Sequence, residues 1–310
     1  MDKKAKILVA GTGALIGSAI VRQLGHQGYC NLLTEELDFT DAKVVNHYFS
    51  ETEPDYVFVA AGNSGGIGAN QKFPADLIRD NLLTACHIIH SAYVYKAKKL
   101  LYLASSCCYP KFCPQPMRVK SLLTGPLEPS NDAYATAKIA AIQLCQAYRR
   151  QHGANFISAI PANAFGPGDD FSLEDSHVIA ALIRKVHEAK TQRLPFIEVW
   201  GTGSPRREFI YADDLGDACI FTMLNYDKSE PINLGTGYDF SIRQLAELIR
   251  ELGGYTGEIR FDSTKPDGMP AKLLDSSPVR ELGWKPRTDF GTALRETYQS
   301  FRTAKPTCQT

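Results

Sequence analysis

Short runs of β-branched and apolar residues alternate along the chain with longer segments in which apolar residues recur every three or four positions. The short runs predict buried strands at Lys6–Ala10, Tyr29–Leu33, Tyr56–Ala60, Leu100–Ala104 and Phe156–Ile160. The longer segments predict helices at Gly17–Leu24, Ala42–Glu51, Asp76–Tyr95 and Tyr134–His152. Because strands that alternate with crossover helices form parallel sheets, the pattern predicts an α/β fold with a doubly wound parallel sheet.

The regular alternation weakens after Pro161, where turns rich in Pro and Gly separate shorter segments. Two further stretches of helical period, Val178–Lys190 and Ser241–Leu252, predict the helices of a smaller α/β domain. We expect residues 1–162, joined by about 206–236, to form the first domain. The segments at about 163–205 and 237–310 are expected to form the second.

The composition is that of a globular protein, with 44% hydrophobic and 22% charged residues among 310. Lys and Arg together number 34, as do Asp and Glu, so no net charge attracts the chain to nucleic acid or to an anionic membrane. No apolar run is long enough to span a bilayer, and glycines interrupt the stretch near the N-terminus that superficially resembles a secretory signal. Eight scattered cysteines without a CxxC pair indicate reduced thiols rather than disulfides or structural zinc. We therefore expect a cytoplasmic protein without a bound metal.

A glycine-rich turn, GTGALIG, follows the first predicted strand and leads into the first helix. Such a turn brings backbone N–H groups and a helix N-terminus to a pyrophosphate. The spacing departs from GxGxxG, so a tight packing turn is the alternative. The residues of the turn that we expect to contact a dinucleotide are Gly11, Thr12, Gly13, Ala14, Leu15, Ile16 and Gly17.

The end of the second strand commonly distinguishes NAD from NADP, because an acidic residue there binds the ribose diol whereas a cation binds the 2′-phosphate. The stretch Thr34–Glu36 offers two carboxylates and no cation, so charge alone favours NADH. Asp38 is expected to lie beside the adenine, or to belong to an ordinary helix cap. Ala60 and Ala61 end the third strand with small side chains that leave room for a cofactor, or that form a plain turn.

Tyr134 and Lys138 lie four residues apart, on one face of a predicted helix. A neighbouring cation stabilises a phenolate and lowers the pKa of a tyrosine, which suits the phenol to proton transfer. The pair follows the glycine turn and a strand that ends at Ser105–Cys107. This order of glycine turn, serine-bearing strand and YxxxK helix resembles the short-chain dehydrogenase/reductase family, which implies a Rossmann fold and a nicotinamide cofactor.

Longer sequence motifs resemble one subgroup of this family in particular. Pro161–Pro167 and Arg207–Asp213 are similar to the extended members, which act on nucleotide sugars. The strings that resemble the GDP-L-fucose synthase family are Ser105–Lys111, Gly65–Asn70, Ser176–Val178 and Lys265–Gly268. That family implies 3,5-epimerisation and then NADPH-dependent 4-reduction of GDP-4-keto-6-deoxy-D-mannose to GDP-L-fucose. It implies NADP(H), with NAD(H) as the alternative, and a homodimer that pairs the helices Asp76–Tyr95 and Tyr134–His152 about a twofold axis.

The resemblance also implies roles for individual residues. Cys107 is the base and His177 the acid of the epimerisation. Tyr134 protonates the carbonyl oxygen, Lys138 tunes Tyr134 and holds the nicotinamide ribose, and Ser105 bonds the keto oxygen. Further cofactor contacts are expected from Leu103, Ala104, Pro161, Ala162, Asn163, Ala164 and His177. Substrate contacts are expected from Lys185, Trp200, Arg207 and Asp267.

Departures from the family pattern keep alternatives open. Ala14 replaces a glycine, and Thr12–Gly13 stands where relatives carry a cation for the 2′-phosphate, so the choice between NADPH and NADH stays open. Gly168–Asp170 replaces a His-Asp-Asn string close to the sugar, which leaves a dideoxy or heptose GDP-sugar as an alternative substrate. Ser106 is the rival of Ser105. A non-catalytic dinucleotide sensor is the alternative from another class of protein.

Overall fold

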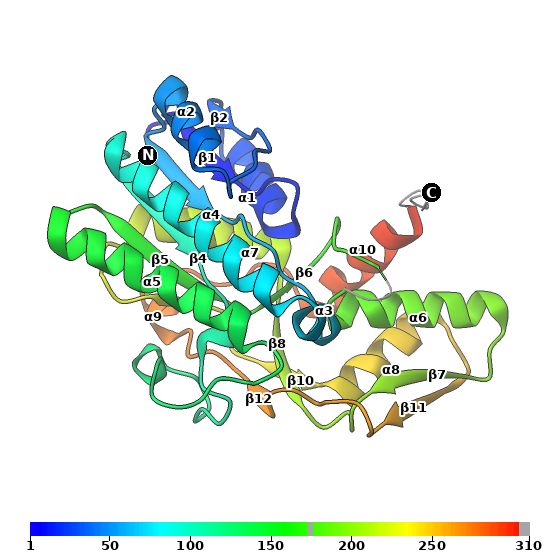
Figure 1. Cartoon of the computed structure of the whole chain (residues 1–310). Coiled ribbons are helices and arrows are strands. Elements are labelled where there is room, and N and C mark those ends of the chain that lie inside the picture. The colour runs from blue at the N-terminus through cyan, green and yellow to red at the C-terminus, as the bar shows by residue number, and fades with distance from the viewer. Residues whose placement is uncertain (173–175, 304–310) are drawn as a thin grey trace.

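The computed structural model describes residues 1–172 and 176–303, so Cys308 and parts of the expected second domain lie outside the described residues. The described residues form a six-stranded parallel sheet in the order β2-β1-β3-β4-β5-β9 (Figure 1). Its strands are β1 (Ile7–Ala10), β2 (Leu32–Leu33), β3 (Tyr56–Val59), β4 (Lys99–Leu103), β5 (Phe156–Pro161) and β9 (Ile232–Leu234). The α/β class and the doubly wound sheet predicted from the hydrophobic pattern are confirmed.

The second strand is shorter than the sequence predicts. The Tyr29 N–H donates to the carbonyl of Leu24 at 3.0 Å, and the Cys30 N–H donates to the carbonyl of Lys3 at 3.3 Å. These bonds hold the start of the predicted strand against the end of α1 (Leu15–His26) and against the N-terminal segment. Only Leu32–Leu33 therefore pairs with β1.

Helices cover both faces of this sheet (Figure 1). One face carries α2 (Ala42–Thr52), α4 (Pro74–Val94) and α5 (Asp132–His152), and the other carries α1 and α7 (Ala212–Asn225). The Asp41 carboxylate caps α2 by accepting two backbone N–H groups, and α5 ends at Gly153 in the left-handed conformation with φ of +67°. These local signals explain why the predicted crossover helices form where the periodicity places them.

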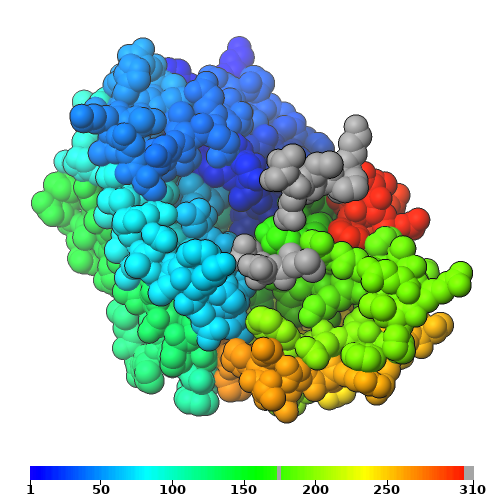
Figure 2. Space-filling view, turned by 45° about the vertical axis from the view of Figure 1, so that its right-hand side comes forward, coloured from blue at the N-terminus to red at the C-terminus, as the bar shows by residue number. Residues whose placement is uncertain are grey.

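A smaller group of elements lies beside the sheet. The strands β6 (Asn163–Phe165), β10 (Asp239–Ser241) and β12 (Ala271–Lys272) pair with β8 (Arg206–Tyr211), and β7 (Phe196–Trp200) pairs with β11 (Glu258–Asp262). The helices here are α6 (Val178–Gln192), α8 (Ile242–Gly253) and α10 (Phe290–Thr303). The remaining described elements are the short helices α3 (Ile67–Lys72) and α9 (Ser277–Glu281) and two one-turn segments at Ser106–Cys108 and Val119–Ser121. Figure 2 shows a hollow in the surface between the dark-blue first residues of the chain and the green segment that includes α6.

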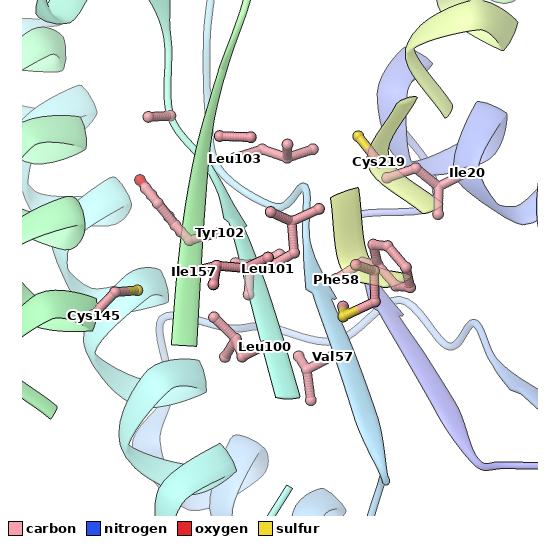
Figure 3. Close-up of a cluster of buried hydrophobic side chains, with 14 of the residues drawn as sticks. Ile20, Val57, Phe58, Leu100, Leu101, Tyr102, Leu103, Cys145, Ile157 and Cys219 are labelled. Carbon is pink, nitrogen blue, oxygen red and sulfur yellow. The ribbon is translucent and has the colours of Figure 1, made fainter. Parts of the chain in front are cut away.

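Two apolar clusters form the interior. Figure 3 shows part of the larger one, where Tyr102 points toward Cys145 of α5, and Phe58 lies on the side of α1 and α7. The smaller cluster joins α6, α8 and α10 to the strands around β8. Met269, Leu274, Val279 and Trp284, which the expected division assigns to the second domain, pack in the larger cluster. The domain boundaries themselves stay a prediction.

The described helices include none that is both long enough and apolar enough to span a membrane.

Candidate active site

The glycine turn lies where β1 ends, directly against the end of β3. Gly11 has φ of +91°, and a Cβ at this position would lie 2.6 Å from the Cα of Ala61. A Cβ at Gly17 would lie 1.9 Å from the carbonyl oxygen of Gly11. Only glycine therefore allows α1 to start this close to the sheet. Ala14 precedes the helix and has no side-chain acceptor, which leaves the N–H groups of the first turn open to an anion.

A cavity of about 430 Å³ opens beside this turn. Its described lining comprises Gly11, Gly13, Ala14, Glu36, Leu37, Asp38, Phe39, Thr40, Ala60, Ala61, Gly62, Asn63, Asp80 and Thr84. The cavity thus joins the helix N-terminus, the end of the second strand and the small residues after β3, which are the parts that hold a dinucleotide in a doubly wound fold. The residues present fit such a cofactor, since small side chains line the turn. Hydrogen bonds from Thr40 hold the pKa of Asp38 below its usual value.

Tyr134 and Lys138 both lie on α5, as their spacing predicts, and the Lys138 Nζ is 5.6 Å from the centre of the Tyr134 ring. Lys138 is buried, its Nζ donates to the carbonyl of Leu103 at 3.4 Å, and burial lowers its pKa to about 8. The pKa of Tyr134 differs from the sequence-based prediction. Burial raises this pKa, and the nearby thiols of Cys107 and Cys108 raise it further, while the Ser105 hydroxyl opposes them. The phenol is therefore protonated at neutral pH, because burial outweighs the hydrogen bond of Ser105.

Cys107 lies beside this pair, in the one-turn segment that follows β4. Its Sγ accepts hydrogen bonds from the Lys272 Nζ at 3.1 Å and from the Asn131 Nδ2 at 3.2 Å. Burial opposes ionisation of the thiol, yet the positive charge of Lys272 and the hydrogen bonds of Ser105 and Lys272 lower the pKa of Cys107 below its usual value. The adjacent Cys108 has the opposite environment, since burial raises its pKa to about 12.

The two serines also differ. The Ser105 hydroxyl accepts the Cys107 N–H at 3.2 Å and interacts with Tyr134, whereas Ser106 is buried. This geometry favours Ser105 over Ser106 as the residue that faces a ligand. Leu103 and Ala104, which precede Ser105 at the end of β4, are both buried.

His177 occupies the N-terminal end of α6. The surrounding protein reduces its hydration and lowers its pKa, and the charge of Lys272 lowers it further, while Asp170 opposes both. His177 and Cys107 therefore both respond to the same lysine charge. In the segment that departs from the family pattern, burial raises the pKa of Asp169 to about 7.

The residues expected at the nicotinamide lie at the end of β5 and on β6. Pro161 ends β5, and Ala162 leads into Asn163 and Ala164 of β6. The Asn163 Nδ2 donates to the carbonyl of Glu208 at 3.1 Å, so this amide also fixes β6 to β8.

The expected substrate residues lie on the smaller group of elements. Arg207 on β8 donates to the carbonyl of Asp267 at 3.1 Å, while the neighbouring Arg206 is paired with Asp239 at 2.6 Å. This difference favours Arg207 as the residue that faces the cleft. The Asp267 carboxylate accepts the Thr202 N–H at 2.7 Å and its hydroxyl at 2.9 Å, which ties it to the turn that follows β7.

Trp200 and Lys185 flank that turn. Trp200 is 48% exposed, which leaves part of its ring accessible to a ligand, and the Lys265 Nζ lies over the ring at 5.4 Å from its centre. The Lys185 Nζ donates to the carbonyl of Glu198 at 2.8 Å, and burial lowers its pKa against the opposing charge of Glu198. Together with Arg207 these groups offer cations and one aromatic surface, which suits a nucleoside diphosphate.

Comparisons with known proteins agree with this geometry. Residues 7–235 match the NAD dependent epimerase/dehydratase family. The chain belongs to that family. GDP-L-fucose synthase 1 of Arabidopsis thaliana is 51% identical over 300 residues, which cover 96% of this chain and 93% of the relative.

Two solved structures are also similar to this chain. A GDP-6-OMe-4-keto-L-xylo-heptose reductase from C. jejuni has a TM-score of 0.93 and 33% identity, and the match covers 98% of this chain and 99% of that one. A GDP-L-fucose synthetase from Naegleria fowleri bound to NADP has a TM-score of 0.89 and 29% identity, and the match covers 97% and 95% of the two chains.

Within this epimerase/dehydratase chain, sequence reasoning missed two groups at the thiol. Lys272 comes from the two-residue strand β12 and lies 165 positions from Cys107 along the chain. Asn131 precedes α5 and has the appearance of an ordinary helix cap in the sequence. The pairing of β12 with β8 that delivers Lys272 has no local sequence signal. The only sequence signal near Lys272 was the Lys265–Gly268 motif, which lies just before β12.

Proposed function

We propose that the chain catalyses 3,5-epimerisation and then NADPH-dependent 4-reduction of GDP-4-keto-6-deoxy-D-mannose to GDP-L-fucose. The observation that carries this proposal is the meeting of two chemistries at one serine: Ser105 contacts both the lysine-activated thiol of Cys107 and the phenol of Tyr134. A reductase needs the tyrosine and the buried Lys138, but it has no use for an activated thiol. The identity with the plant synthase supports the same conclusion.

Epimerisation uses the thiol side of the site. The Cys107 thiolate removes the proton from a carbon next to the ketone, and His177 delivers a proton to the opposite face of that carbon. The charge and the hydrogen bond of Lys272 lower the pKa of this thiol and so favour its anionic form. Reduced hydration and the charge of Lys272 lower the pKa of His177, while the negative charge of a bound diphosphate favours its protonated form. Proton exchange with solvent resets both groups before the second carbon reacts.

Reduction uses the tyrosine side. A bound NADPH supplies the reducing electrons for the ketone. The Tyr134 phenol gives its proton to the carbonyl oxygen, and its raised pKa keeps that proton available at neutral pH. Lys138 holds the nicotinamide ribose, Ser105 orients the keto oxygen, and the turn from Gly11 to Gly17 holds the pyrophosphate.

The decisive experiment is NMR analysis of the product formed in heavy water from GDP-4-keto-6-deoxy-D-mannose and NADPH. GDP-L-fucose carrying deuterium at carbons 3 and 5 is the expected product. The Cys107→Ser variant should bind the cofactor normally and lose both labels, while the matched Cys108→Ser variant should keep them. Reduction without label in the unmodified protein would reject the bifunctional proposal.

The similarity to a heptose reductase supports a second candidate, reduction of a 4-keto heptose or dideoxy GDP-sugar. Gly168–Asp170 is the segment in which this chain departs from the synthase pattern. Turnover of the heptose substrate without carbon-bound exchange, combined with no turnover of the 6-deoxy sugar, would favour that candidate.

We also propose that the chain acts as a cytoplasmic homodimer paired through α4 and α5. Support for the pairing comes from Leu83, Tyr93 and Val94, which are exposed apolar side chains on α4. The described cysteines are free, as expected in a reducing compartment. Light scattering that gives the mass of one chain would contradict the homodimer. The larger domain is proposed to hold the dinucleotide and the smaller one the GDP-sugar.

A further inference from the structure

The strand that carries Lys272 is too short to hold itself in place. Among the described elements, β12 has two residues and pairs with β8 alone, with Lys272 opposite Arg207 (Figure 1). Such a short ladder supplies few hydrogen bonds, so neighbouring groups must fix the backbone around Lys272. Since the Lys272 Nζ lies 3.1 Å from the Cys107 Sγ, a small shift of this backbone would break that contact.

A buried carboxylate binds the chain just after β12. Glu208 lies on β8 and is 1% exposed. Its Oε2 accepts the Leu274 N–H at 2.7 Å, two residues after Lys272, and its Oε1 accepts the Gly237 N–H at 2.7 Å. Burial raises the pKa of Glu208, and these two N–H groups oppose that rise. Glu208 therefore joins β8 and the turn at Gly237 to the segment that carries Lys272.

The surroundings of Glu208 leave room for this carboxylate. A Cβ at Gly235 would lie 2.4 Å from the Glu208 Oε1, so only a residue without a side chain fits there. Because side chains alternate along a strand, Glu208 and Arg207 point to opposite sides of β8. Arg207 acts on the thiol of Cys107 through its charge. Glu208, on the other side, can affect the thiol through the residues that it holds.

We propose that Glu208 is a positioning residue for the epimerisation base: it fixes the backbone after β12 and so keeps Lys272 within hydrogen-bond distance of Cys107. Gln115 also anchors this segment, because its Oε1 accepts the Leu273 N–H at 2.8 Å. Glu208 differs in that it attaches the segment to β8, the strand that pairs with β12. The inference rests on the proposed function, because the position of Lys272 matters to catalysis only if the thiol is the base.

The sign of the change at Cys107 separates positioning from a direct effect of charge. Glu208→Gln keeps the volume, but its NH2 group cannot accept a hydrogen bond, so one of the two backbone N–H groups loses its partner. If Lys272 then moves away, the pKa of Cys107 rises, whereas loss of a nearby negative charge alone would lower it.

The test is alkylation by iodoacetamide across a range of pH, with peptide mass mapping, on the full chain without sugar. In Glu208→Gln the alkylation of Cys107 should move to higher pH and slow about fivefold at neutral pH, which is the scale of one hydrogen bond. Arg207, Cys108 and Tyr134, which also interact with Cys107, stay unchanged in this variant.

Asp214→Asn is the matched control. Asp214 is also a buried carboxylate that accepts two backbone N–H groups, from Arg287 at 3.2 Å and from Thr288 at 3.0 Å, but these lie outside β12 and the residues that follow it. Its substitution should lower the free energy of unfolding and leave the alkylation profile of Cys107 unchanged.

Two further variants test the route through the lysine. Glu208→Gln combined with Lys272→Met should be alkylated like Lys272→Met alone, because Glu208 acts through Lys272. Gly235→Ala crowds the carboxylate without removing its charge, so it should also move the alkylation to higher pH. It therefore replaces Glu208→Gln if that variant does not fold.

Three results decide the matter. An alkylation profile in Glu208→Gln that matches the unmodified protein, or that moves to lower pH, would overturn the inference and leave the proposed function standing. Additive effects in the double variant would overturn it as well. Absence of deuterium exchange from the sugar in the unmodified protein would instead reject the proposed function, and the catalytic role of Glu208 with it.

Discussion

Replacing Lys272 with Met tests whether this cation keeps Cys107 ionised. At 3.1 Å between Nζ and Sγ, a full ammonium and a full thiolate attract by about 5 kcal/mol if the effective dielectric constant is about 20. Part of this is recovered in the variant, because Cys107 is only partly buried and Asn131 and Arg207 still favour the anion. A net loss of about 2 kcal/mol lowers the ratio of thiolate to thiol about thirtyfold.

The sign of the pH effect follows from the same contact. Lys272 lowers the pKa of Cys107, so its removal raises that pKa and moves the thiolate population to higher pH. Exchange of the substrate's carbon-bound protons in heavy water should therefore slow by about tenfold or more at neutral pH and recover as the pH rises. Alkylation of Cys107 by iodoacetamide, followed by peptide mass mapping, should show the same displacement.

Two comparisons separate this role from a structural one. Lys272→Arg keeps the positive charge and should keep most of the low-pH exchange, while Lys272→Met should still bind the dinucleotide if the fold is intact. A pH profile for alkylation in Lys272→Met that superimposes on that of the unmodified protein would refute the reasoning. The thiolate would then depend on other groups.

Three further outcomes are expected. Tyr134→Phe should slow reduction by about 10²–10⁴-fold while carbon-bound exchange continues, measured by nucleotide absorbance and NMR on one sample, and loss of both would show that the two chemistries share the phenol. Asp41→Ala should cost about 1 kcal/mol in urea unfolding because it removes the cap of α2, with Asp41→Asn largely restoring it. Burial lowers the pKa of Lys138 to about 8, so the folded protein binds this proton less readily than the unfolded chain does. The charged Lys138 therefore lowers the free energy of unfolding fully below about pH 8, and this effect declines as the pH rises toward the ordinary lysine pKa of 10.5. The gain in unfolding free energy of Lys138→Met over the unmodified protein should therefore be larger at pH 7 than at pH 10, and an equal gain at both would contradict a buried ammonium.

The elements that local periodicity determines were predictable from the sequence. Apart from the second strand, which is shorter than predicted, the strands and crossover helices of the first half are confirmed, because each buries an apolar stripe that repeats within its own segment. The strand β9 and the small sheet around β8 were not predicted, since strands of two or three residues carry almost no periodic signal. Tyr134 and Lys138 were placed on one helix face by spacing alone, yet the direction of the tyrosine pKa depended on burial, which spacing does not report.

The overall composition also does not report how charge is distributed within the site. Acidic and basic residues balance along the chain, which correctly removes any general attraction to polyanions. Within the cleft they separate: Lys272 and Arg207 both act on the thiol, while Glu36 and Asp38 line the cavity at the adenosine end. The two ends of the cleft, which a dinucleotide and a sugar diphosphate would share, therefore have electrostatic potentials of opposite sign. The cationic end suits the developing negative charge of epimerisation. For that reason Lys272→Met should change the pH profile of proton exchange and leave the dissociation constant of the dinucleotide unchanged, and a change in both would mean that the two ends are coupled.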